Sequence, residues 1–314
     1  GKYTIIGVTL FAIAFIGPLV AVNYISLCLS LFVVGIFSGS TDVAMNTLVS
    51  EIEKHDNNNF MSSAHGFFSL GGVIGAMLGS MLMTYFILPV YHMMIIASCV
   101  IAINLRLAKH YINIKESNTS EEKKTFHLSA FKPLLVIAFL AFVIMISEGA
   151  IEHWSTLYLL EVVEISQKNL AGLGFIFFST TMTLGRFFGD GISKKTGSIG
   201  IILLGSLLAS IGYLGVLFNQ FIVTVFGFGL IGLGLSVIVP ELFRIAGKTH
   251  GVSASTGISF VSGVGFMGFL VGPVALGFVS DIYSLKMSFL VLFVLTVFAL
   301  ITSLFKLKKK VIRV

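Results

Sequence analysis

The sequence predicts an all-α membrane protein, a helical bundle of two parallel repeats. Of its 314 residues, 56% are hydrophobic and 11% charged, whereas roughly 25% are charged in an average soluble domain. Apolar runs of about 20 residues, the length that crosses a bilayer, recur along the whole chain. Two blocks of these runs resemble one another at a fixed offset, and basic residues gather on one predicted side.

Ten apolar segments are long enough to be transmembrane helices, and polar residues or turn formers separate them. They cover residues 4–22, 26–49, 62–87, 90–108, 132–157, 168–189, 198–218, 220–243, 253–280 and 284–306.

The positive charge is distributed unevenly across the predicted topology. When the loops alternate from side to side, all 20 Lys and Arg residues except Lys168 and Lys286 fall on one side. Cytoplasmic loops carry such an excess of basic residues, so we expect a multi-pass protein of the plasma (bacterial inner) membrane with both termini of the chain cytoplasmic. Because the basic residues gather on the predicted cytoplasmic side of a lipid bilayer, the net charge of +6 does not indicate a nucleic-acid partner, and we expect none.

A glycine pattern recurs at a fixed distance. The first copy consists of Gly72, Gly75 and Gly79, and the second of Gly265, Gly268 and Gly272. The offset between the two copies is 265 − 72 = 193 residues. Small residues at this spacing let helix backbones approach closely. Parallel repeats of membrane-helix blocks are typical of a large class of transporters.

The same offset predicts what each half contains. Gly1 falls on Lys194, so the spans at 132–189 have no counterpart in the first half. We expect ten helices, 4+6 of a 6+6 protein whose first two helices are not in this chain. The predicted domains are an incomplete N-terminal helical bundle, a polar cytoplasmic linker, and a six-helix bundle with a basic tail, at residues 1–108, 109–131 and 132–314.

Carboxylates inside apolar spans are the first candidates for function. Asp42 is followed four residues later by Asn46, and Glu148 by Glu152, so each pair shares a helix face. A charge in hydrocarbon is costly and is tolerated where it faces a polar cavity or a proton path. Low dielectric favours the protonated carboxyl, as a proton carrier requires. The alternative is a structural hydrogen bond to a neighbouring helix.

Two further residues are candidates for substrate binding or proton coupling. His65 lies near the cytoplasmic end of its span, where it is suited to gate, bind substrate or titrate. It is equally suited to a hydrogen bond between helices. Trp154 is the single tryptophan, and it suits either an interfacial anchor or stacking against a ring-shaped substrate.

Arg186 and Asp190 are spaced i, i+4 at the cytoplasmic end of their span. We expect a charge pair that latches an inner gate and breaks as the two halves rock. The alternative is an interfacial ion pair, which contributes only about 0–1 kcal/mol.

Five segments together resemble the major facilitator superfamily, and more narrowly its fucose-permease-like bacterial branch. They resemble that branch's motifs in helices four, five and seven, the loop between helices eight and nine, and helix eleven: GSTDVAMN (39–46), MSSAHGFFSLGG (61–72), EGAIEHWS (148–155), GRFFGD (185–190) and FLVGP (269–273). The resemblance implies that the chain holds helices three to twelve of a twelve-helix carrier. It also places Asp42 on an acidic position implicated in proton coupling and His65 near the cavity.

The sequence therefore predicts a secondary active transporter that moves a small-molecule substrate, sugar-like or polar, by alternating access with protons or sodium. An exporter of amphipathic compounds and a non-transporting sensor or scaffold are the alternatives. No clustered nucleophile-base set, metal set or nucleotide-binding domain is visible, so we expect no enzyme activity, cofactor or metal. We also expect a monomer.

Overall fold

The structure is a computed structural model and describes residues 1–86, 88–117 and 131–307. Within these residues the regular structure is entirely helical, and nine helices are long and apolar enough to cross a membrane. The predicted all-α membrane fold is confirmed. Most of the predicted linker, 118–130, and the end of the predicted basic tail, 308–314, lie outside the described residues.

Packing divides the described chain into two compact units. Unit 1 contains residues 1–58, 68–86, 88–117 and 253–255; unit 2 contains residues 59–67, 131–252 and 256–307. Two short segments are thus grouped away from their sequence neighbours, so one helix in each half begins in one unit and continues in the other.

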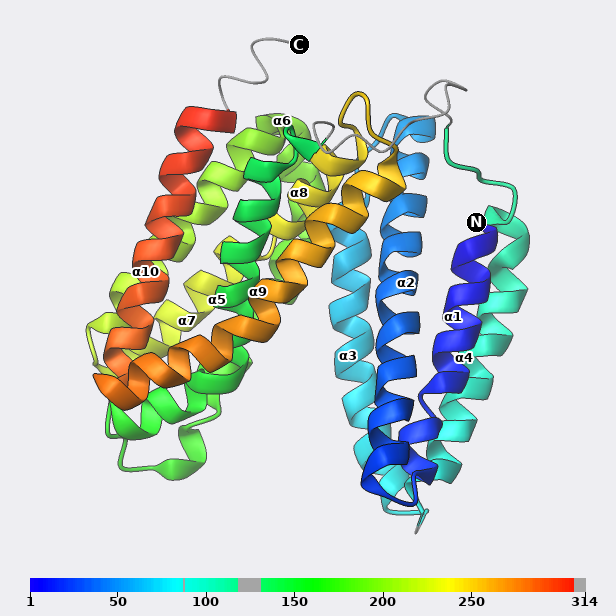
Figure 1. Cartoon of the computed structure of the whole chain (residues 1–314). Coiled ribbons are helices and arrows are strands. Elements are labelled where there is room, and N and C mark those ends of the chain that lie inside the picture. Colours follow the sequence, from blue (N-terminus) through cyan, green and yellow to red (C-terminus); the bar gives the residue numbers. More distant parts are fainter. Residues whose placement is uncertain (87, 118–130, 308–314) are drawn as a thin grey trace. The chain divides into compact units, whose positions relative to one another are not determined.

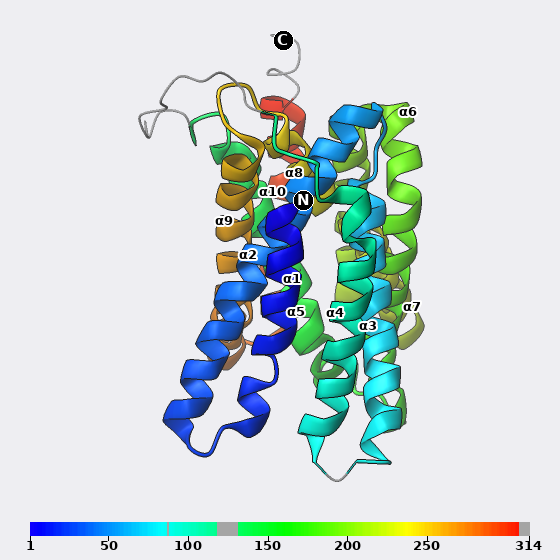
Figure 2. The same cartoon turned by 90° about the vertical axis from the view of Figure 1, so that its right-hand side faces the viewer.

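Unit 1 is built from four long helices and one short 3-10 turn. These are α1 (Lys2–Ala14), η1 (Gly17–Val20), α2 (Tyr24–Asp56), α3 (Met61–Met83, from Phe68 onward) and α4 (Pro89–Tyr111). Helix α1 lies against α2 and α4 (Figures 1 and 2). A capping box starts α2, since the Asn23 side chain accepts from Ser26 N at 2.8 Å and Ser26 Oγ accepts from Asn23 N at 3.1 Å.

Buried polar side chains tie the helices of unit 1 together. Thr4 Oγ1 donates to the carbonyl of Ala44 on α2 at 3.2 Å. Asn104 Nδ2 on α4 donates to the carbonyl of Ile5 on α1 at 3.0 Å, and Tyr111 OH donates to Asn104 Oδ1 at 2.6 Å. Such hydrogen bonds orient helices in a lipid environment, where apolar burial does not favour one neighbour over another.

Unit 2 contains the remaining helices around an apolar core. They are α5 (Leu135–Glu161), η3 (Lys168–Leu170), α6 (Leu173–Leu217), α7 (Phe221–Leu235), α8 (Ile238–Gly247), α9 (Ala254–Ile282, from Thr256 onward), α10 (Leu285–Thr302) and η4 (Ser303–Leu307). Three buried rings meet in the core: the Tyr158 centroid is 4.4 Å from that of Phe289, which is 5.8 Å from that of Phe228.

Helix α6 corrects one detail of the prediction. Its 45 residues would extend about 68 Å at about 1.5 Å per residue, twice the hydrocarbon thickness of about 30 Å. The break is at Gly197, with φ 73° and ψ 162°. The two parts correspond to the predicted spans 168–189 and 198–218, but the intervening residues 190–196, expected to be a loop, are helical.

The predicted span at 220–243 is also divided. It consists of α7 and α8, which are separated at Ser236 and Val237. Pro240 has no N–H to donate to the carbonyl four residues earlier, and its ring clashes there, so a continuous helix is disfavoured.

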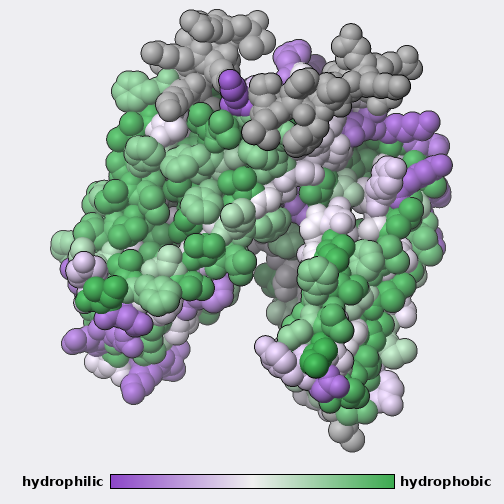
Figure 3. Space-filling model, viewed as in Figure 1, coloured by the Kyte–Doolittle hydropathy of each residue, from purple (hydrophilic) through white to green (hydrophobic). Residues whose placement is uncertain are grey.

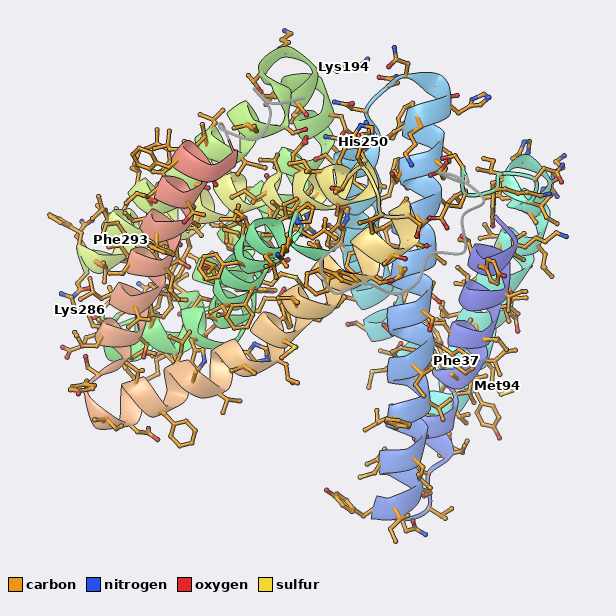
Figure 4. All side chains as sticks on the ribbon, turned by 45° about the horizontal axis from the view of Figure 1, so that its top comes forward. Phe37, Met94, Lys194, His250, Lys286 and Phe293 are labelled. Carbon is orange, nitrogen blue, oxygen red and sulfur yellow. The ribbon has the colours of Figure 1, made fainter. Side chains whose placement is uncertain are left out.

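The surface of each unit agrees with a membrane setting. In each unit, Figure 3 shows apolar residues between ends where hydrophilic residues gather. Within unit 2, Lys194 and Lys286 lie at different ends (Figure 4), in agreement with the predicted alternation of these two loops.

The repeated glycines behave differently in the two copies. A Cβ on Gly268 would meet the carbonyl oxygen of Phe142, and one on Gly272 would lie 3.1 Å from the Cα of Ile146. The predicted close approach of helix backbones is therefore confirmed for α9 against α5. In the first copy, Gly75 and Gly79 have no described atom within 4 Å of such a Cβ.

Candidate functional site

Unit 2 contains a group of buried charged side chains on three of its helices, which we call the charged cluster. Its members are Glu148 on α5, Arg186 and Asp190 on α6, and Glu241 and Arg244 on α8. Isolated charges are not tolerated in such surroundings, so the partners of each one define what the cluster does.

Glu148 and Arg186 form an ion pair between α5 and α6. Arg186 Nη2 lies 3.1 Å from Glu148 Oε1, and the two side chains are 8% and 15% exposed, respectively. The structure thus brings together two residues that the sequence identified separately, one as a proton-coupling acid and the other as a gate. An i, i+4 pattern within α6 did not indicate this partner, which is 38 residues away.

Asp190 is an ion-pair partner and a helix cap at once. Its Oδ1 lies 2.6 Å from Arg244 Nη2. The same carboxylate accepts from the backbone N–H groups that begin α3, from Ser62 at 3.1 Å and from Ser63 at 2.7 Å. These are donors that the helix itself leaves unpaired, and a negative charge there is favoured by the helix dipole.

Two further contacts near Asp190 accompany the close approach of α3 to α6. Ser62 Oγ donates to the carbonyl of Arg186 at 2.8 Å. A Cβ on Gly189 would meet Ser62 Oγ, so a larger residue is excluded at that position. The predicted gate residues Arg186 and Asp190 therefore both contact the first turn of α3, the former through its backbone.

Arg244 connects the cluster to α8. Its Nη1 donates to Glu241 and to Ser193 Oγ, the latter at 3.1 Å. Ser193 Oγ also accepts from Asn59 Nδ2 at 3.3 Å. Sequence reasoning used Arg244 only as a basic residue ending a span and missed Glu241, although an acid three residues before an arginine in an apolar run is a signal for such a pair.

Asp42 and Asn46 form a second polar site, in α2 of unit 1. Asn46 Nδ2 donates to Asp42 Oδ1 at 3.0 Å and to the Asp42 carbonyl at 2.9 Å. The predicted pairing on one helix face is confirmed. The other carboxylate oxygen, Asp42 Oδ2, is buried and has no hydrogen-bond partner within the described structure.

The remaining candidates are His65, Glu152 and Trp154. His65 is half-buried on α3, with its ring centroid 5.7 Å from that of Phe243. Glu152 is exposed on α5. Trp154 follows on the same helix, and its buried Nε1–H has no partner in the described part of the chain.

Trp154 lines a pocket of about 620 Å³ between α5 and α9. The walls are mostly apolar and include Leu157 and Val274, with His153 beside the indole. His153 Nδ1 lies 2.7 Å from the carbonyl of Gly149, which fixes the ring through its own helix. In the described residues no three His, Cys, Asp or Glu side chains are grouped to hold a metal ion.

Comparison with known proteins identifies the family. The family model described as Major Facilitator Superfamily matches residues 2–256. The chain belongs to the Major Facilitator Superfamily. The predicted resemblance is confirmed, and the superfamily helices and the apolar composition together make the chain a multi-pass membrane transporter by fold and family.

Curated superfamily relatives carry names of transporters or membrane proteins. An uncharacterized MFS-type transporter of Yersinia pestis is 33% identical over 265 residues, which are 84% of this chain and 68% of that protein. Membrane protein MosC of Rhizobium meliloti is 28% identical over 301 residues, 94% of this chain and 72% of the relative. Transporters of this superfamily bind small-molecule substrates.

Solved structures of the superfamily share the fold. FucP, a Major Facilitator Superfamily transporter crystallised in the outward conformation, has a TM-score of 0.79 at 18% identity, and the match covers 96% of this chain and 82% of FucP. The human organic anion transporter MFSD10 has a TM-score of 0.72 at 13% identity, covering 96% and 76%. At these identities the likeness concerns the fold.

Proposed function

We propose that this protein is a secondary active transporter that moves a small polar solute by alternating access, coupled to protons through Asp42. The observation that carries the proposal is the carboxylate of Asp42, which lies in a membrane-spanning helix with one oxygen on Asn46 and the other buried without a described partner. An acidic side chain inside a membrane span is tolerated where it faces a polar cavity or a proton path.

Asp42 is better suited to carry the proton than Glu148. Arg186 Nη2 lies 3.1 Å from Glu148 Oε1, so the carboxylate of Glu148 has a buried cation as its partner. In the described part of the chain, the side chain shown to hydrogen-bond the Asp42 carboxylate is the neutral amide of Asn46. We therefore assign Glu148 and Arg186 to a charge pair, and Asp42 to the protonation step.

The charged cluster is our candidate for the inner gate. Asp190 holds the first turn of α3 by two backbone N–H groups and is itself held by Arg244. Opening of the gate then consists of withdrawing those N–H groups from Asp190, after which Arg244 and water satisfy the carboxylate. His65, one turn further along α3, moves with this helix start.

The proposed solute is sugar-like or otherwise polar, because an acid and an amide in one span provide both acceptors and donors. One observation favours export of an amphipathic compound as a second candidate. The pocket beside Trp154 has mainly apolar walls and a buried indole N–H without a described partner. A ring-shaped apolar compound with one acceptor would satisfy that donor.

The proposed setting is the bacterial inner membrane, with both ends of this chain in the cytoplasm and one chain as the transporting unit. The distribution of basic residues supports this orientation, since only Lys168 and Lys286 of the 20 lie on the other side. Sodium is the alternative coupling ion.

The test uses the full-length protein in sealed vesicles. A panel of labelled sugars, other polar solutes and amphipathic dyes is offered under an inward proton gradient, an inward sodium gradient, or no gradient. Proton-driven accumulation of a polar solute is the expected result. Accumulation driven by sodium alone, or proton-driven export of the dyes, would replace this proposal with its alternative, and no flux of any compound would favour a sensor or scaffold.

The role of Asp42 is tested in the same vesicles with Asp42→Asn. Because asparagine cannot release a proton, the variant is expected to lose accumulation driven by the proton gradient while it retains exchange of labelled for unlabelled solute. Asp281→Asn removes an exposed carboxylate from the end of α9 and should leave both activities unchanged. Proton-driven accumulation by Asp42→Asn at the parent level would refute the assignment.

A further inference from the structure

Helices α3 and α9 begin at equivalent positions of the internal repeat. With the offset of 193, Met61 corresponds to Ala254 (61 + 193 = 254), and these residues are the first of α3 and α9. In both helices the next residue is a serine, Ser62 or Ser255. Both helix starts are also grouped with the unit that does not contain the rest of the helix.

A carboxylate accepts hydrogen bonds at each of these helix starts. For α3 it is Asp190, as described above. For α9 it is Glu116, whose Oε1 accepts from Ser255 N at 2.8 Å and whose Oε2 accepts from Ser255 Oγ at 2.9 Å. Glu116 follows α4 and lies within the predicted linker, residues 109–131. Sequence reasoning gave this residue no role.

The residues that hold the two capping segments, Glu51 and Arg244, also occupy equivalent positions of the repeat. Glu51 corresponds to Arg244 (51 + 193 = 244), and Arg244 holds Asp190 at 2.6 Å. Glu51 Oε2 accepts from the backbone N–H of Ser117 at 3.0 Å, and so fixes the residue next to Glu116. The Oε1 of Glu51 is in turn 2.6 Å from Lys54 Nζ. The α9 cap thus repeats the α3 cap with a different set of residues.

The two caps differ in how firmly they are held. Asp190 belongs to a long helix, is 9% exposed and is paired with a buried arginine. Glu116 is half-buried on a segment without regular secondary structure, and the partners that the structure shows for its carboxylate are both atoms of Ser255. Loss of a helix cap changes an equilibrium about two- to thirtyfold, so the Glu116 cap is within the range that a conformational cycle can make and break.

We propose that Glu116 is a releasable cap through which the linker holds the first turn of α9 to unit 1. When the carboxylate binds Ser255, the start of α9 is fixed beside Glu51 and the linker. When it leaves, the first turn of α9 loses an anionic cap and is free to follow the rest of its helix in unit 2. By this proposal, Glu116 takes part in the conformational cycle by binding and releasing the start of α9.

The first experiment measures exposure of the start of α9 directly, without any transport. Ala254 is 3% exposed and becomes the single thiol when Cys28→Ala, Cys99→Ala and Ala254→Cys are combined. The purified protein in nanodiscs is labelled with a maleimide, so both membrane faces are accessible. Addition of Glu116→Gln is expected to raise the labelling rate about two- to thirtyfold, whereas Glu116→Asp, which keeps the charge, should raise it less.

Asp281→Asn is the matched control, because it removes an exposed carboxylate from the other end of the same helix. Its labelling rate should equal that of the parent. Equal rates for Glu116→Gln and the parent would overturn the proposal, as would an equal increase in Asp281→Asn.

The second experiment tests the contact itself. Glu116→Cys and Ser255→Cys in the cysteine-free background should form a disulfide under mild oxidation, because these two side chains are in contact. Lys115→Cys with Ser255→Cys should form less, because Lys115 is exposed. No preference for the first pair would refute the cap. Neither experiment depends on a solute or a proton gradient, so its outcome is independent of the transport proposal.

Discussion

The carboxylate of Asp190 lies 2.6 Å from the guanidinium of Arg244, and each side chain is less than 10% exposed. Opposite charges removed from water in this way compensate each other, since the desolvation of either one alone costs several kcal/mol, and Glu241 is a second buried partner of Arg244. Asp190 also accepts two N–H groups from the start of α3. The pair therefore fixes α3 to α6 and α8 within unit 2.

Replacement of Asp190 by Asn is expected to destabilise the protein by about 1–3 kcal/mol, because Arg244 loses one of its two buried carboxylate partners and keeps only Glu241. Thermal unfolding of purified protein in detergent measures the effect as a lower midpoint. Asp281→Asn, at an exposed site, should change the stability by no more than about 0.5 kcal/mol. Equal midpoints for the two variants would show that the buried pair is not stabilising.

Glu148 and Arg186 are expected to be coupled energetically. A double-mutant cycle with Glu148→Gln, Arg186→Gln and the double variant should give an interaction energy of about 1–3 kcal/mol, as found for contacting buried residues. The comparison pair is Glu51 and Lys54, where Lys54 is 32% exposed and about 0.3–0.5 kcal/mol is expected. Additive effects at Glu148 and Arg186 would contradict the ion pair.

The sequence predicted the helices well because the signal for a membrane span is local. An apolar run of sufficient length is sufficient evidence for a helix in lipid, where every backbone group must be paired internally. The predicted start of the second span at residue 26 is two residues from its observed start at Tyr24. The prediction of a loop at 190–196 was wrong because it rested on polarity alone. The structure keeps these residues helical and makes the turn at Gly197.

The partners of the charged residues could not be predicted in the same way. Arg186 pairs with a residue 38 positions away and Arg244 with one 54 positions away. A single sequence indicates that a buried charge needs a partner but does not say which helix supplies it. The pairing of Asp42 with Asn46 was predictable because both residues lie on one helix face.

The repeated glycines provide a matched test of helix packing, since Gly75 and Gly268 are equivalent (75 + 193 = 268). Gly268→Ala is expected to destabilise the protein by about 1–3 kcal/mol, because its Cβ would overlap the Phe142 carbonyl oxygen. Gly75→Ala meets no described atom within 4 Å and should be neutral or stabilising by up to about 1 kcal/mol. Thermal unfolding in detergent separates the two, and a larger loss for Gly75→Ala would contradict the packing.

Gly197 is expected to tolerate a side chain poorly because of its backbone conformation. Its φ of 73° and ψ of 162° lie in a region that is essentially restricted to glycine, so Gly197→Ala should cost about 1–3 kcal/mol through backbone strain alone. No described atom lies within 4 Å of its added Cβ, which separates strain from overlap.

Gly191 provides the control for this prediction. It lies six residues earlier in the same helix, also with open space around an added Cβ but without a positive φ. Gly191→Ala should therefore stabilise α6 by up to about 1 kcal/mol through helix propensity, so the two alanine variants should shift the unfolding midpoint in opposite directions. If both variants raised the midpoint, α6 would accept a right-handed residue at position 197, and the division of its 45 residues into two membrane spans would have to lie elsewhere in the helix.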